Sequence, residues 1–250
     1  MSTPSNLAHF LEKEEIVVFS AVGIDELEAP DRSDVITFLP GAQSVIVLAR
    51  SPDPGVFSLP REEETRAMVR IATDLDRAAH RLAEELRREG FNAMTVPFLI
   101  PVREHEGRIS GLVNLKHIAA AGGLGSRGKS TLLISPQYGN RLVLSGVVSS
   151  MRVPAGIHPE AADPCGSCDR CIRSCPGNAI DARGVDPFRC LNVRRHIPGP
   201  LIRPVRWLLR RRLLQQLLAP VAPFFLRFST LRCSRCVTVC PYFTVEKAGE

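Results

Sequence analysis

The sequence predicts an α+β protein in which a layered α/β domain comes first and a small cysteine-rich domain follows. Strand-like and helix-like apolar patterns alternate over residues 1–152, all eight cysteines lie between Cys165 and Cys240, and Pro and Gly concentrate at 153–164. At 250 residues the chain is long enough for one sizeable core and a smaller appended unit. We therefore expect domains at 1–152 and 153–250.

The first half of the α/β domain is expected to hold two strands and the longest helix. A short helix over 4–14 precedes strands at 16–22 and 44–49, which are apolar runs bounded by Gly and Pro. Over residues 62–88 apolar side chains recur about every 3.6 positions, and Gly90 follows as a helix stop. This is the strongest helix signal in the chain.

The second half of this domain continues the alternation. A strand is predicted over 91–98, a helix over 111–121, and two further strands over 131–135 and 142–149. Turn residues at 138–140 lie between the last two strands, which predicts that these strands pair with each other.

The start of the sequence and the distribution of cysteine bear on location. No basic segment leads into an apolar one near the N-terminus, and no uncharged apolar run reaches about 18 residues. We expect a cytoplasmic protein without a membrane span. The cysteines are confined to one part of the chain instead of being spread through a small disulfide scaffold, so we interpret them as metal ligands.

The spacing of the cysteines is the most informative pattern in the chain. One run matches the bacterial ferredoxin sequence C-x2-C-x2-C-x3-C-P, in which three thiolates bind one [4Fe–4S] cluster and the fourth reaches a second cluster. A later run, C-x2-C-x3-C-P, lacks one cysteine of that pattern, and a single cysteine remains to complete it. The first run is Cys165, Cys168, Cys171, Cys175 and Pro176, and the second is Cys233, Cys236, Cys240 and Pro241, with Cys190 between them.

Eight cysteines therefore satisfy two clusters with four ligands each. In such proteins the last cysteine of each run crosses over to the cluster of the other run. By this crossover rule the first cluster takes Cys165, Cys168, Cys171 and Cys240, and the second takes Cys175, Cys190, Cys233 and Cys236. The alternative is a pair of zinc sites, but these favour two separated C-x2-C pairs over four ligands crowded into one short run. The sequence thus predicts two neighbouring [4Fe–4S] clusters and a role in electron transfer.

A glycine-rich loop at 123–130, GLGSRGKS, matches the nucleotide-binding patterns G-x-x-x-x-G-K-[ST] and G-x-G-x-x-G. Both patterns require a strand before the loop and a helix after it, whereas here a helix is predicted before the glycines and a strand after them. Two interpretations stay open: a glycine helix stop with tight turns, or a backbone that closely approaches a large flat cofactor. The second interpretation makes Gly123, Gly125, Gly128 and Lys129 cofactor-binding residues.

Three stretches of the chain resemble epoxyqueuosine reductase: KHIAAAGGLGSRGKSTLLISPQYGNRLVLSGVV, then CGSCDRCIRSCPGNAI with FRCLNV, and finally CSRCVTVCP. That family is cobalamin-dependent and related to corrinoid reductive dehalogenases. The resemblance, clearest over 110–190 and 233–243, implies a nitroreductase-like α/β domain followed by a two-cluster ferredoxin-like domain. It also implies an iron–sulfur oxidoreductase that passes electrons through both clusters to cobalamin or to a substrate in the first domain.

Two departures bear on the reaction that the resemblance implies. Family members carry an acidic proton donor in a D-T-x-P-V-L-E-like run, where this chain has ISGLVNLK at 109–116 and Ile109 at the acidic position. The family also continues past its last cysteine into a tRNA-binding helical region, whereas ten residues follow Cys240 here. No catalytic residue is assigned, and tRNA is not an expected partner. The alternatives are a non-catalytic ferredoxin-type electron carrier with a cofactor-free docking domain, and a protein that reduces or stores a corrinoid.

Arginine is concentrated at 183–235, which holds twelve arginines, no lysine and one acidic residue, in a chain of net charge +6. Inside the insert at 194–232, leucines and Trp207 are helix-spaced beside arginines over 203–228, a basic amphipathic pattern. The pattern predicts an anionic partner: a nucleic acid, an acidic redox protein that donates electrons, or an anionic membrane surface at the inner membrane face, with lipid preferred over tRNA. The alternative is a helix that covers the clusters and leaves its arginines in solvent.

Overall fold

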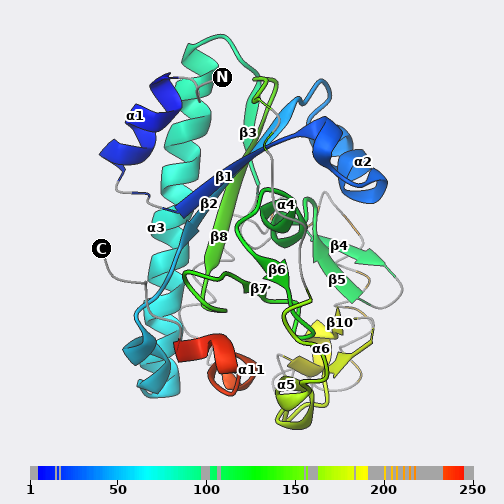
Figure 1. Ribbon diagram of the computed structural model, residues 1–250. Helices are drawn as coiled ribbons and strands as arrows, with labels where there is room; N and C mark the ends of the chain where they lie inside the picture. The colour runs from blue at the N-terminus through cyan, green and yellow to red at the C-terminus, as the bar shows by residue number, and fades with distance from the viewer. Residues whose placement is uncertain are drawn as a thin grey trace.

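The computed structural model describes residues 5–14, 16, 18–96, 102–105, 108–154, 156, 163–182, 184–190 and 233–244, together with single positions between 200 and 217. The long helix α3 (Arg61–Arg88) runs along one face of a central sheet, and the short cysteine-bearing elements gather near one end of that sheet (Figure 1).

The central sheet is fully antiparallel, with strand order β1-β2-β8-β3. Its strands are β1 (Val18–Gly23), β2 (Ser44–Arg50), β8 (Val143–Ser149) and β3 (Ala93–Thr95). In β2 every residue except Arg50 is buried, so buried and exposed side chains do not alternate along this strand. Such a run is what a strand needs when both faces of its sheet are covered.

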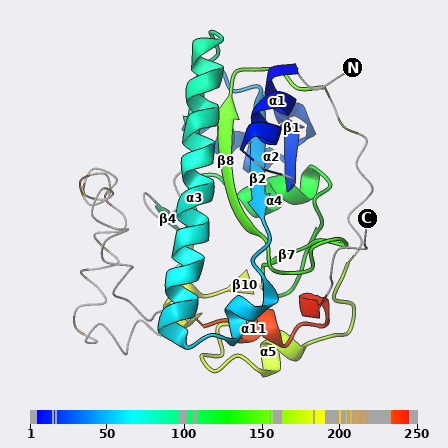
Figure 2. The ribbon, with the colours of Figure 1, turned by 90° about the vertical axis from the view of Figure 1, so that its left-hand side faces the viewer.

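Helices cover both faces of the sheet, which gives three layers (Figures 1 and 2). On one face, α1 (Ser5–Lys13) and α3 pack against Ile46 and Leu48 of β2. On the other face, α4 (Leu115–Ala121) packs against Val45 and Val47, and α2 (Ala29–Phe38) contributes to the same core. The two apolar cores are separated by the sheet itself.

Charge and glycine explain the ends of α3. Its first turn carries Glu62, Glu63 and Glu64 and its last turn carries Arg87 and Arg88, so the side-chain charges oppose the helix dipole at both ends. Gly90 follows with φ of +91°, a left-handed conformation that glycine adopts without a steric penalty.

Several short elements surround the sheet. They include the 3₁₀ turns η1 (Ile24–Glu26) and η2 (Pro54–Ser58), the hairpin of β4 (Val102–His105) with β5 (Arg108–Gly111), and the pair β6 (Ser126–Arg127) with β7 (Leu133–Ile134).

The cysteine-bearing part of the chain is built from very short elements. They are α5 (Arg170–Arg173), β9 (Ile180–Asp181), β10 (Gly184–Val185), α6 (Pro187–Cys190), α11 (Arg235–Thr238) and the 3₁₀ turn η3 (Pro241–Thr244). This part docks on the α/β layers through a small apolar cluster of Phe57, Met68 and Val237. The rings of Phe57 and Phe243 meet edge to face with centroids 5.5 Å apart.

The predicted helices at 4–14 and 62–88 and the strands at 16–22 and 44–49 are confirmed to within a few residues. Of the strand predicted at 91–98, the structure has β3, and positions 97–98 lie outside the described residues.

Two predictions about the second half of the α/β domain were wrong. The helix predicted from residue 111 begins at Leu115, because 108–111 is the outer strand of a hairpin that the sequence did not reveal. The strands predicted at 131–135 and 142–149 do not pair with each other: β7 pairs with β6, and β8 pairs with β2 and β3. The intervening turn closes only the single bridge between Ser135 and Gly139.

Among the residues that the structure describes, no helix combines the length and apolar character needed to cross a membrane.

Candidate metal centre

The eight cysteines are all free thiols and all partly buried. Four lie at and around α5, one ends α6, and three lie at and around α11. Because α5 and α11 contact each other, the fold brings segments about 60 residues apart in sequence into one region.

One group of thiols forms around α5. Burial raises the pKa of Cys171, and the neighbouring thiols of Cys165 and Cys240 raise it further. Burial also raises the pKa of Cys240, with added contributions from Cys165 and Cys168. Each of these four thiols is thus an electrostatic neighbour of others in the same set.

A second group lies beside α4. Burial raises the pKa of Cys190, with contributions from Cys233 and Cys175, while the ammonium of Lys116 opposes the shift. Burial raises the pKa of Cys236 to about 11, with Cys190 and Cys233 as its strongest thiol neighbours. Cys171 influences Cys236 more strongly than Cys175 does, so the thiols predicted for the two clusters lie close together.

Each group has a sulfur that accepts a hydrogen bond from the main chain. The amide of Lys129 donates to Sγ of Cys165, and the amide of Ala179 donates to Sγ of Cys175, both at 3.3 Å. Main-chain N–H groups that point at cysteine sulfur stabilise thiolate and are among the factors that set cluster potentials.

Within the described residues, no three His, Cys, Asp or Glu side chains converge as the ligands of a single metal ion would. A [4Fe–4S] cluster needs one thiolate at each of four irons, so its ligands stand around a whole cubane and not around one ion.

The glycine loop lies against the cysteine-bearing part. Helix α4 ends at Gly122, and strand β7 follows the loop, the reverse of the order in nucleotide-binding loops. A Cβ at Gly125 would lie 2.2 Å from the carbonyl oxygen of Ile134, and a Cβ at Gly128 would lie 3.3 Å from Sγ of Cys165. These two glycines therefore permit close packing of the protein on itself.

The other predicted cofactor-binding residues have distinct surroundings. Gly123 is exposed, with φ of +76°. The ammonium of Lys129 donates hydrogen bonds to the carbonyl oxygens of Gly166 and Cys168. Binding of a cofactor by Gly123, Gly125, Gly128 and Lys129 stays a prediction.

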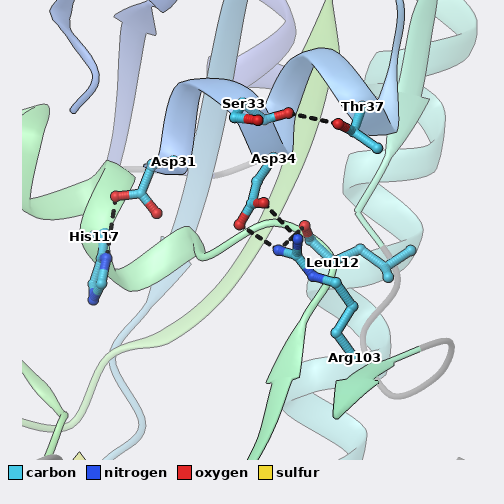
Figure 3. A network of polar contacts seen from close by, with 7 residues as sticks. All are labelled: Asp31, Ser33, Asp34, Thr37, Arg103, Leu112 and His117. Carbon is cyan, nitrogen blue, oxygen red and sulfur yellow. Dashed lines mark hydrogen bonds and ion pairs between the residues drawn. The ribbon is translucent and has the colours of Figure 1, made fainter. Parts of the chain in front are cut away.

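A polar network that the sequence did not reveal joins α2 to its neighbours (Figure 3). Asp34 accepts two hydrogen bonds from the guanidinium of Arg103 in β4, and that guanidinium also donates to the carbonyl oxygen of Leu112 at 2.9 Å. Asp31 lies 3.1 Å from Nδ1 of His117 in α4. The spacing of the two aspartates, three residues apart on one helix, was the available signal.

His117 also connects α2 to the glycine loop. The guanidinium of Arg127 donates to Nε2 of His117, so that nitrogen accepts and Nδ1 carries the proton donated to Asp31. Ile109, which the sequence resemblance predicts to replace the family's acidic residue, lies in β5 with its backbone paired to Glu104, and its side chain lies outside the described residues.

Only isolated positions of the arginine-rich insert are described. Pro204, Trp207, Leu214 and Leu217 are helical, whereas Arg211 is not, so the predicted helix is interrupted. Trp207 is 54% exposed and Leu217 is 75% exposed, and the guanidinium of Arg211 stacks 5.2 Å from the Trp207 ring centroid.

No protein-family model matches the chain, but curated relatives do. The chain is 31% identical over 126 residues to epoxyqueuosine reductase of Listeria monocytogenes, which covers 50% of this chain and 28% of that protein. It is 29% identical over 174 residues to the Gloeobacter violaceus protein (65% and 49% covered) and 23% identical over 223 residues to that of Bacillus cereus (88% and 53%). The chain thus spans about half the length of these relatives or less.

Solved structures of epoxyqueuosine reductases share the fold of this chain. Epoxyqueuosine reductase from Bacillus subtilis matches 97% of this chain and 66% of its own, with 16% identity and a TM-score of 0.58. An epoxyqueuosine reductase bound to an epoxyqueuosine-modified tRNA-Tyr stem loop matches 98% of this chain and 67% of its own, with 15% identity and a TM-score of 0.59. The chain is therefore similar in sequence to epoxyqueuosine reductases over part of their length, and it shares their fold.

Proposed function

We propose that the chain is an iron–sulfur oxidoreductase that carries electrons through two [4Fe–4S] clusters to a cofactor or substrate in the α/β domain. The observation that carries this proposal is the convergence of eight partly buried thiols from three segments on one region of the fold. The cysteine spacing assigns Cys165, Cys168, Cys171 and Cys240 to one cluster, and Cys175, Cys190, Cys233 and Cys236 to the other.

The chemistry of the donors suits this assignment. Thiolates are soft anionic ligands that match iron in a sulfide cluster, which supplies one-electron chemistry when bound. Burial keeps the free thiols protonated, because it raises the pKa of Cys171, Cys190, Cys236 and Cys240. Iron must therefore displace these protons, and cluster assembly should release them to solvent.

Cobalamin, which the family resemblance implies, is proposed only as a ligand of the α/β domain. On the side where a Cβ would stand, Gly125 and Gly128 pack against Ile134 and Cys165, so that side is not available to a flat ring. Of the four residues predicted to receive it, Gly123 alone is exposed. The present contacts of the loop favour support of the cysteine turn.

The second candidate function is a non-catalytic electron carrier whose first domain serves for docking. It is favoured by Ile109 at the position where the relatives carry an acid, since an isoleucine cannot donate a proton. Both candidates require the clusters and differ in whether the α/β domain binds a redox-active ligand.

Anaerobic reconstitution with iron and sulfide tests the shared part of both candidates. We expect about eight irons and eight sulfides per chain, with broad visible absorption that bleaches on reduction. Stoichiometric zinc without sulfide would refute the proposal. Adding cobalamin to the reconstituted protein then separates the candidates, because a shift in the corrinoid spectrum requires binding, whereas its absence favours the carrier.

We also propose that the arginine-rich insert binds an anionic lipid surface. Exposed Trp207 and Leu217 offer apolar contact beside Arg211, and each arginine near an anionic membrane contributes about 1 kcal/mol. Flotation with vesicles with and without phosphatidylglycerol tests this, using the wild type and an Arg210/Arg211/Arg212→Glu variant. Equal flotation of both proteins would contradict lipid binding by these arginines and would favour a role of the insert in docking a redox protein.

A further inference from the structure

Lys129 binds the first cysteine turn through both its main chain and its side chain. Its amide donates to Sγ of Cys165 at 3.3 Å, and its ammonium donates to the carbonyl oxygens of Gly166 at 2.7 Å and Cys168 at 3.0 Å. The carboxylate of Asp163 accepts from the amides of Cys165 and Gly166 at 2.9 and 3.2 Å. A cation thus binds the carbonyl groups of this turn and an anion binds its amides.

The glycine loop is shaped to bring Lys129 to this turn. The amide of Thr131 donates to the carbonyl of Gly128 at 2.9 Å, and the amide of Gly128 donates to that of Leu132 at 3.0 Å, which closes a tight turn. Gly128 is buried, and a Cβ there would lie only 2.7 Å from Cδ1 of Ile134. A larger residue at 128 would therefore displace the end of the Ile134 side chain and crowd Sγ of Cys165, which lies 3.3 Å from such a Cβ.

These contacts leave the ammonium of Lys129 little capacity to bind a phosphate. An ammonium has three protons, and two of them are directed at peptide carbonyls of the cysteine turn. In a nucleotide-binding loop the equivalent lysine reaches toward phosphate oxygens. Here the same residue pattern connects two domains.

We propose that Lys129 positions the first cysteine turn and raises the reduction potential of the cluster bound there, an inference that rests on the proposed two-cluster function. Reduction adds one electron, supplied by an external donor, to a cluster that its thiolates already make negative. A hydrogen bond to the ligand sulfur and a nearby fixed positive charge both stabilise the reduced state. Lys129 supplies both to the same turn.

The test compares Lys129→Met with Lys129→Arg in the anaerobically reconstituted full chain. Iron and sulfide are measured, and each cluster is titrated with dithionite while its electron paramagnetic resonance signal is followed. Methionine keeps the length of the side chain but carries neither charge nor donor, so we expect one midpoint potential to become more negative while the other is unchanged. Arginine keeps the charge and the donors, so we expect the midpoint potential of Lys129→Arg to lie close to the wild-type value.

Two further variants serve as controls. Arg127→Met removes a positive charge from the same loop, but Arg127 contacts His117 and not the cysteine turn, so both potentials should stay at the wild-type value. Gly128→Ala crowds Sγ of Cys165 and leaves the charge of Lys129 in place, so we expect it to retain both clusters and to shift the potential less than Lys129→Met does.

The outcomes separate the inference from the function on which it rests. Wild-type potentials in Lys129→Met, or an equal shift in Arg127→Met, would overturn the inference while leaving two clusters in place. A wild-type chain that binds no iron and sulfide would refute the proposed function itself. In a Cys168→Ala chain that retains the second cluster, Lys129→Met should have no effect on the remaining potential, and a shift there would also overturn the inference.

Discussion

The α/β layers and the cysteine-bearing part of this chain are stabilised in different ways. Strand β2 is buried on both faces, and Val45, Ile46, Val47 and Leu48 have no exposed surface. Among the residues of 163–182, 184–186, 189–190 and 233–243, whose burial is described, the buried apolar side chains are only Ala179, Ile180 and Val237.

Element length sharpens the contrast. Helix α3 has 28 residues, whereas α5 and α11 have four residues each. A single helical turn is far below the length at which a helix is stable without other support. The α/β layers can therefore fold on their apolar cores, and the cysteine-bearing part adds the stability of whatever its thiols bind to its small docking cluster.

Removal of the clusters should have the largest effect, and it should be confined to one region. In the metal-free, reduced chain we expect 163–190 and 233–244 to stay docked but to open locally, so that their amides exchange with solvent faster than those of β2 and β8. Hydrogen exchange measured before and after chelation checks this. Loss of protection throughout the sheet would show that the two regions fold as one unit.

Single cysteine substitutions should each remove one cluster. Cys175→Ala and Cys190→Ala should both retain about four of eight irons and the same residual paramagnetic signal, because both residues lie in the second group. Cys240→Ala should retain the other signal, because Cys240 lies beside Cys165 and Cys168. A shared residual signal for Cys171→Ala and Cys175→Ala would contradict the crossover.

The metal-free chain should lose stability in alkali. The pKa of Cys236 is raised from an ordinary 9.0 to about 11, so the folded chain holds this proton more tightly than the unfolded chain does. The contribution of this proton to the free energy of unfolding is fully present below pH 9.0 and is lost as the pH rises toward about 11. Cys171, Cys190 and Cys240 shift in the same direction.

Thermal unfolding of the anaerobic, metal-free protein on either side of this range measures the effect. Burial lowers the pKa of Lys116, which opposes the trend, so wild type and Cys236→Ala are compared at each pH. The loss of stability in alkali should be smaller for Cys236→Ala than for the wild type. An identical loss in both proteins would show that Cys236 does not carry it.

The sequence predicted most where the signal is local. The 3.6-residue period of α3 and the apolar run of β2 depend on burial of neighbouring positions, and both elements formed close to where they were expected. The ligand spacing is equally local, since a ferredoxin run is a short contiguous pattern.

What the sequence did not predict depends on partners distant in the chain. Helix α2 has weak apolar periodicity, and its burial rests on Val35. The contacts of Asp31 with His117, and of Asp34 with Arg103, join residues 86 and 69 positions apart. The partner of β8 is β2, across nearly 100 residues, and no turn signal could reveal that choice over the nearer β7.

The ion pair between Asp34 and Arg103 should make the smallest measurable contribution, and it belongs to the α/β side of the comparison. The two side chains are 26% and 32% exposed, and the guanidinium binds both carboxylate oxygens and the carbonyl of Leu112. This geometry anchors the β4–β5 hairpin to α2. A paired, partly screened interaction of this kind is worth about 1 kcal/mol.

Arg103→Ala should therefore lower the free energy of unfolding of the α/β layers by about 1 kcal/mol, and Asp34→Ala by a similar amount. The double variant should cost less than the two single losses added together, because each removes the same interaction. Arg103→Lys should recover only part of the loss, since an ammonium cannot reproduce the two parallel hydrogen bonds of the guanidinium. The matched control is the pair of Arg66 and Glu62 on α3, which is 61% and 66% exposed and should contribute almost nothing. Denaturant unfolding of the metal-free chain gives these values, and strictly additive losses at Asp34 and Arg103 would mean that the pair does not hold the hairpin.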